Sequence, residues 1–220
     1  MAYPTVSKPY GLKPINLIGG QVFAGSTRQR RIASGASSIG YGDPLQFDTD
    51  GTVKVTTSTT TGPSSGFAGV FLGCSFVSSV TGQPTYSQSW ISGTSVKSGT
   101  YITAYVADDP DTLFQVVGCE SGTVVSTTSG FQYGDIGNNV ALVANTLNTN
   151  TGDSQQGVLV SSAATTRSLP IRIIDVVPDT AFDVSGTTYF PEVIVKFNAP
   201  YVDSGSLTLG GHAYNNALGT

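Results

Sequence analysis

Short apolar segments alternate with turn-forming residues along most of the chain, without a sustained period of 3.6 residues. Segments of this kind, which end at Gly, Pro, Asn, Asp or Ser, are typical of β-strands. Their close spacing is that of a sandwich or a barrel. The predicted strands are Leu45–Phe47, Val53–Thr57, Phe67–Val77, Tyr101–Val106, Leu113–Val117, Phe131–Tyr133, Val140–Ala144, Gly157–Ser161, Leu169–Val177 and Val193–Phe197.

The connections between these segments have recognisable turn chemistry. Asp50-Gly51, between Phe47 and Val53, predicts a tight hairpin, and residues 56–65 and 145–153 are rich in Thr, Ser and Asn, as surface loops are. Thr and Ser make up 28 and 26 of the 220 residues, which disfavours helices because both compete for helical backbone hydrogen bonds. We therefore expect an all-β fold, a β-sandwich or a barrel-like and jelly-roll-like domain.

The first 31 residues differ from the rest in charge. They contain five basic residues and no acid, whereas the other 189 contain five basic and 14 acidic residues, a balance of +5 against -9. Pro4, Pro9 and Pro14 favour extended backbone. We predict an extended N-terminal arm over residues 1–31 and a β-rich domain with a C-terminal tail over residues 32–220. The alternative is that the arm forms a first edge strand of the domain, because residues 21–23 and 29–32 resemble strands.

A basic arm on an acidic body predicts a partner surface of opposite sign. The overall pI of about 4.7 argues against nucleic acid and favours a protein partner. The arm residues expected to make this contact are Lys8, Tyr10, Lys13, Arg28, Arg30 and Arg31. No apolar run approaches the ~18 residues of a membrane span, and the start has no export signal, so we expect a protein made in the cytoplasm and not bound to a membrane.

Candidate chemistry is sparse. Gly62-Pro63-Ser64-Ser65-Gly66 fits the nucleophile motif G-x-S-x-G, but Pro63 and the flanking Thr residues predict a loop instead of a strand-to-helix turn. His212 is the only histidine and is expected to be a surface or interface residue. We expect no enzyme activity and no cofactor.

Three further features bear on candidate chemistry: the acidic residues, the two cysteines and Trp90. The acidic residues at 48, 50, 108, 109 and 111 fit turns and strand ends better than calcium loops, although calcium is not excluded. Cys74 and Cys119 have no metal-ligand spacing and are expected to be small buried hydrophobes, with a mutual disulfide as the alternative. Trp90, the only residue that could form a sugar platform, is expected to pack in the core or at an interface.

Several short phrases, in order along the chain, resemble the capsid cement or decoration proteins of cyanophages and related tailed bacteriophages. Each phrase is weak alone, and their order carries the resemblance. The C-terminal His212-Ala213-Tyr214-Asn215-Asn216 departs from the ending typical of that family, where the His and Tyr follow the last strand more closely, and Ala199 to Gly211 is an insertion before it. The resembling phrases are Pro9-Tyr10-Gly11-Leu12-Lys13-Pro14, Tyr41-Gly42-Asp43-Pro44-Leu45, Gly69-Val70-Phe71-Leu72-Gly73, Ala107-Asp108-Asp109-Pro110-Asp111, residues 169–179 and Val195-Lys196-Phe197-Asn198.

The resemblance implies a structural virion protein on the exterior of the capsid, with the major capsid protein of the same phage as its partner and no catalytic residues. We further expect copies to associate on the particle, as trimers at local three-fold positions, and to be mainly monomeric off it. Two alternatives from other classes are a phage tail or receptor-binding protein and, less favoured, a carbohydrate-active protein.

Overall fold

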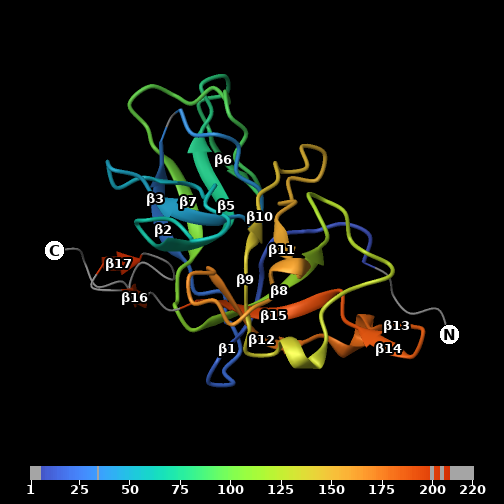
Figure 1. Cartoon of the computed structure of the whole chain (residues 1–220). Coiled ribbons are helices and arrows are strands. Elements are labelled where there is room, and N and C mark those ends of the chain that lie inside the picture. The colour runs from blue at the N-terminus through green and yellow to red at the C-terminus, as the bar shows by residue number, and fades with distance from the viewer. Residues whose placement is uncertain (1–5, 34, 199–200, 204–205, 209–220) are drawn as a thin grey trace.

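The computed structural model describes residues 6–33, 35–198, 201–203 and 206–208. Its strands form two main sheets, a barrel-like sheet in the upper part of Figure 1 and a second sheet below it. The described residues contain no α-helix, only three single 3-10 turns at Tyr133–Asp135, Val160–Ser162 and Pro178–Thr180. The predicted all-β class and barrel-like or sandwich architecture are confirmed.

Five strands of the first sheet pair in a ring, in the order β3-β4-β2-β7-β5 and back to β3. The ring closes because β3 is antiparallel to both β4 and β5, while β2 and β4 meet at a single parallel pair. A sixth strand, β6, extends the sheet from β5. The strands are β2 (Arg28–Ile32), β3 (Pro44–Phe47), β4 (Val53–Val55), β5 (Phe67–Val77), β6 (Pro84–Ser87) and β7 (Ile102–Ala107).

The interior of this barrel is a separate hydrophobic core. Trp90 is its largest side chain, and its ring meets Phe76 edge to face with centroids 5.7 Å apart. The Trp90 indole donates a hydrogen bond to the carbonyl of Ala36, which satisfies the only polar atom of the ring. Trp90 is therefore a core residue, as expected from the sequence, and is not available as a sugar platform.

The second sheet has the order β10-β11-β8-β15-β12-β9. On the side of β8 away from β15, β1 pairs with the first half of β8 and β11 with its end. Two small hairpins, β13-β14 and β16-β17, lie outside both sheets. The strands are β1 (Lys13–Leu17), β8 (Thr112–Cys119), β9 (Asn139–Val140), β10 (Leu142–Val143), β11 (Gly157–Leu159), β12 (Ile171–Val176), β13 (Phe182–Val184), β14 (Thr187–Tyr189), β15 (Glu192–Phe197), β16 (Tyr201–Asp203) and β17 (Ser206–Thr208).

A second hydrophobic core joins the barrel wall to this sheet. It contains side chains from β5 and β7 together with side chains from β8, β12 and β15. Phe67 of β5 stacks on Phe197 of β15 with ring centroids 4.4 Å apart, and Phe114 of β8 packs against the same ring at 5.5 Å. The shared core makes the two sheets parts of one packed structure.

The chain passes from the barrel into the second sheet at the acidic turn between β7 and β8. Asp108, at one end of the turn, forms ion pairs with Arg28 at 2.6 Å and Arg30 at 3.6 Å, both on β2. Asp111, at the other end, forms an ion pair with Lys196 of β15 at 2.7 Å. Asp109 accepts a hydrogen bond from the backbone of Asp111. The turn is thus tied to both sheets, and its carboxylates have structural partners.

Gly69 shows why glycine is needed at one point of the long strand β5. Its φ is +125°, and a β-carbon there would lie 2.3 Å from the carbonyl oxygen of Ala107. This close approach of β5 to β7 is possible only without a side chain. One of the phrases that carries the family resemblance begins at this position.

The predicted free N-terminal arm requires correction. Residues 13–17 form β1, which pairs with β8, and residues 28–32 form β2, which closes the barrel between β4 and β7. The division at residue 31 therefore does not coincide with a boundary of the fold. The reason lies in β2, whose last residue, Ile32, is buried in the barrel core.

Both cysteines are free and buried, as the sequence led us to expect. Burial raises the pKa of the Cys74 thiol and of the Cys119 thiol to about 11, so both stay protonated at neutral pH. They behave as small hydrophobes.

Candidate functional site

The basic strand β2 presents its side chains to two sides. Arg28 and Arg30 lie on the side that leads to Asp108, and Arg30 also lies over the ring of Phe47, 5.2 Å from its centroid. Gln29 and Arg31 lie on the opposite side, because neighbouring residues of a strand alternate. Only Arg31 of the three predicted contact arginines therefore has its charge directed away from Asp108.

Arg31 stacks on an aromatic ring at the barrel surface. Its guanidinium carbon lies 3.6 Å from the centroid of the Tyr101 ring, and Tyr101 is 62% exposed. The register explains the contact: Arg31 is paired with Thr103, so Tyr101, two residues before Thr103, is its diagonal neighbour on the same face. The stacked pair is an exposed cation held on a preformed aromatic platform.

This pair lines a groove of about 780 Å³. Its lining comes from β2, the start of β7, the tip of the β3-β4 hairpin and the turn at residues 96–101. Arg30 and Lys97 are the other basic residues of the lining, and the only acidic residue among the lining residues is Asp50. The groove thus combines three basic side chains, one of them (Arg30) paired with Asp108, with an exposed aromatic ring and several hydroxyl groups, a composition suited to an acidic or hydroxyl-bearing protein surface.

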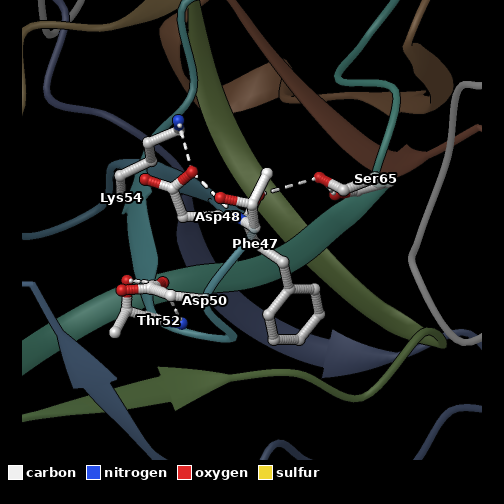
Figure 2. Close-up of polar contacts among 8 residues, drawn as sticks. Phe47, Asp48, Asp50, Thr52, Lys54 and Ser65 are labelled. Carbon is white, nitrogen blue, oxygen red and sulfur yellow. Dashed lines mark hydrogen bonds and ion pairs between the residues drawn. The ribbon is translucent and has the colours of Figure 1, made fainter.

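The β3-β4 hairpin that forms one rim of the groove is held by local contacts, shown in Figure 2. Asp50 accepts hydrogen bonds from the backbone and hydroxyl of Thr52 at 2.9 and 2.6 Å, and Asp48 pairs with Lys54 at 3.1 Å. Ser65 donates to the carbonyl of Phe47. The predicted Asp50-Gly51 hairpin is confirmed, with Gly51 at a φ of +79°.

These contacts also bear on the calcium alternative. The hydrogen bond from the Thr49 backbone and the contact with Lys54 hold the pKa of Asp48 below its usual range, and the hydrogen bonds from Thr52 do the same for Asp50. Both carboxylates are thus ionised and already engaged in the turn. Nowhere in the described part of the chain do three or more His, Cys, Asp or Glu side chains gather in a way that could hold a metal ion.

The other predicted contact residues form a second cluster on the lower sheet. The hydroxyl of Tyr10 donates to Glu192 of β15, and Gln115 of β8 donates to the same carboxyl oxygen at 3.0 Å. Lys13 of β1 lies over the Tyr10 ring, 4.2 Å from its centroid. Burial, together with Glu192, raises the pKa of Tyr10, so its hydroxyl remains a donor. Lys8 is exposed beside this cluster in the chain.

Tyr10→Phe should lower the free energy of unfolding by about 1.5 kcal/mol, because the buried Glu192 carboxyl then loses one of its two side-chain donors. Urea denaturation monitored by circular dichroism measures the loss. Tyr86→Phe is the matched control, since Tyr86 is 75% exposed, and should change stability by less than about 0.5 kcal/mol. Equal stability of Tyr10→Phe and the parent would contradict this account.

The six predicted contact residues therefore separate into two groups, one around β2 and one around Tyr10. Lys97 and Tyr101, which complete the groove, were not predicted as contact residues. The sequence shows only a Lys and a Tyr on either side of Gly99. It does not show that β2 pairs with β7, which brings Tyr101 beside Arg31.

Residues 62–66 form a turn in which Gly66 donates to Pro63, and the strand-to-helix geometry of a nucleophile elbow is not formed there. His212 lies outside the described residues.

Comparison with known proteins supplied no relative: no family model, curated protein or solved structure matches this chain. Within its described residues, no helix has the length and apolar character needed to cross a membrane.

Proposed function

We propose that this protein is a capsid cement protein of a tailed bacteriophage. It would bind the major capsid protein on the outside of the assembled shell. The free energy of this binding would stabilise the shell, and no reaction would be catalysed. The observation that carries the proposal is the groove beside β2, where Arg31 stacks on the exposed ring of Tyr101 and Lys97 is a further basic lining residue. The proposed partner, the major capsid protein, comes from the resemblance of the ordered sequence segments to capsid cement proteins.

Charge supports a role for the groove in docking. Arg28 and Arg30 pair with Asp108, and Lys196 pairs with Asp111. Part of the basic charge of the N-terminal segment is therefore compensated within the chain. Arg31 and Lys97 line the groove, where a partner's carboxylates can approach them. A guanidinium already held on an aromatic ring loses little side-chain freedom when a partner binds, which favours affinity.

Stabilisation follows from mass action. A ligand that binds only the assembled lattice shifts the equilibrium toward that lattice in proportion to its occupancy. Repeated over the copies of a shell, a modest affinity per site resists opening collectively.

We further propose that copies form trimers on the particle and are mainly monomeric in solution. A closed ring of three gives each copy an equivalent position at a local three-fold axis. Exposed large hydrophobic side chains such as Val22, Val80 and Val124 are scattered over different loops, which fits weak contacts between copies better than an obligate apolar interface.

The test is cosedimentation of the purified chain with expanded capsids that lack decoration. Arg31→Glu and Tyr101→Ala should each weaken binding about tenfold. Arg31→Glu reverses the charge in the groove, and Tyr101→Ala removes the ring on which the Arg31 guanidinium stacks. The loss for Arg31→Glu should shrink as salt rises, since exposed charges are screened over ~8 to 10 Å.

Arg167→Glu is the matched control, because Arg167 is exposed and does not line the groove, and it should bind like the parent. Unchanged binding of both groove variants would show that the groove is not part of the interface with the capsid. Absence of parent binding to capsids would reject the cement function, and binding to purified tails instead would establish the tail alternative.

A further inference from the structure

A second pocket, which shares no lining residue with the groove, contains a buried carboxyl group that the proposed function does not use. Its volume is about 610 Å³, and it lies between the loop before β3, the end of β4 and the loop after β10. Asp43 and Gln156 form its polar wall, and both are 1% exposed. Its other lining residues are Ser37, Ser38, Val55, Thr56, Thr57, Ser92, Ala144, Asn145, Thr146, Leu147 and Thr149.

The donors around Asp43 are all uncharged. One carboxyl oxygen accepts a hydrogen bond from the backbone of Gly40 at 2.7 Å, and the other accepts from the hydroxyl of Ser154. None of the residues that line the pocket is basic. Burial of a carboxylate without a countercharge is costly, and the cost appears as a pKa of Asp43 raised to about 6.

Gln156, whose side chain also interacts with Asp43, adds a second acceptor to the pocket. Its side-chain oxygen is fully buried, and no donor among the described residues reaches it. A buried amide oxygen without a donor costs about 1 to 3 kcal/mol. The backbone of Gln156 holds the side chain in place, since its N–H donates to Ser154 and its carbonyl accepts from Gly11.

The rest of the pocket restricts what can satisfy these acceptors. Val55, Ala144 and Leu147 supply apolar surface, and the Ser and Thr residues supply hydroxyls. A charged donor on an aliphatic stem fits both parts, because an ammonium group has three donors and methylene groups pack on apolar walls. A bare divalent cation is a poorer match, since calcium takes six to eight oxygen ligands and this pocket has a single carboxylate.

We propose that this pocket binds a primary alkylammonium group, such as a lysine side chain or a free aliphatic amine. The ammonium would pair with Asp43 and donate to Gln156, while the methylene stem contacts Val55, Ala144 and Leu147. The site is independent of capsid binding and would stand if the proposed function failed.

The test uses the full chain and small probes, followed by NMR of the side-chain amides of Asn145 and Gln156. n-Butylammonium should give saturable shifts with a millimolar or lower Kd, and n-butanol should bind at least about tenfold more weakly because it lacks the charge. Sodium chloride at the same concentration should give no saturable shift. N-acetyl-lysine methylamide and 1,4-diaminobutane, compared in parallel, distinguish a lysine from a free amine as the preferred source.

Two variants test the assignment of residues. Asp43→Asn should raise the Kd for n-butylammonium at least about tenfold. Ala144→Trp should also weaken binding at least about tenfold by filling the mouth of the pocket, where Ala144 is exposed; it answers the question even if Asp43→Asn does not fold. Ala24→Trp, at an exposed alanine outside the pocket, is its control. Equal binding of n-butylammonium and n-butanol, or parent-like binding by Ala144→Trp, would overturn the proposal.

Discussion

Trp90→Ala should lower the free energy of unfolding by about 3 to 5 kcal/mol, the largest loss that we expect from a single substitution in this chain. Trp90 is 1% exposed and is the largest side chain in the barrel core. Its removal would leave a cavity against Phe76 and an unpaired carbonyl at Ala36. Trp90 also exchanges two backbone hydrogen bonds with Ile39, which restricts how far the surrounding chain can relax into that cavity.

Urea denaturation followed by circular dichroism measures this loss. Trp90→Phe should cost less, because it retains part of the buried ring. Tyr101→Ala is the surface control; Tyr101 is 62% exposed, so its removal should change stability by less than about 1 kcal/mol. If Trp90→Ala stayed within about 1 kcal/mol of the parent, the barrel core described above would not be organised around this residue.

The strands with a clear apolar pattern could be predicted from the sequence. Phe67–Val77 matches β5 at both ends, and the strands near residues 45, 53, 102, 113, 157, 171 and 193 were located within a few residues. Their burial patterns alternate or are continuously apolar, as buried strands require. The segment predicted as a strand at Phe131–Tyr133 is instead a single bridge followed by a 3-10 turn.

Other strands gave too weak a local signal. β1 and β6 contain Pro and polar residues and no buried side chain, and they are held by pairing with β8 and β5. The β3-β4 hairpin was predicted from Asp50-Gly51, but closure of the barrel also needs β3 to pair with β5 and β2 to pair with β4, and no local pattern reveals these two pairings. Tertiary pairing, not strand propensity, decides these elements.

The candidate site shows the same division. Excess positive charge indicated Arg28, Arg30 and Arg31 as contact residues, but the sequence could not show that Arg28 and Arg30 would form ion pairs with Asp108. Nor could it show the stacking of Arg31 on Tyr101, since these residues are 70 positions apart and meet only through the register of β2 and β7. A charge count identifies the basic residues, whereas only the fold separates Arg28 and Arg30, which pair with Asp108, from Arg31, which stacks on Tyr101.

The last prediction concerns Asp43 and the dependence of stability on pH. The pKa of Asp43 is about 6 in the folded protein, against 3.8 for an unperturbed aspartate, because burial disfavours the charged form. The folded state therefore binds the proton more tightly than the unfolded state, so this group's contribution to stability is greatest at low pH and is lost as pH rises through about 6. Between pH 7.5 and 4.5 the gain should be about 2 kcal/mol.

The gain is measured as the difference between the parent and Asp43→Asn, because that comparison cancels the titration of carboxyls common to both chains. Asp48 and Asp50, whose pKa values are lowered, act in the opposite direction, and they contribute equally to the two proteins. The asparagine side chain of the variant does not titrate, so the stability of the parent relative to the variant should rise by about 2 kcal/mol on going from pH 7.5 to 4.5. A constant difference across this range would mean that the Asp43 carboxyl titrates as it does in the unfolded chain. A difference that grew toward high pH instead would mean that Asp43 is stabilised in its ionised form, by a cation that its neutral neighbours Gly40 and Ser154 do not provide.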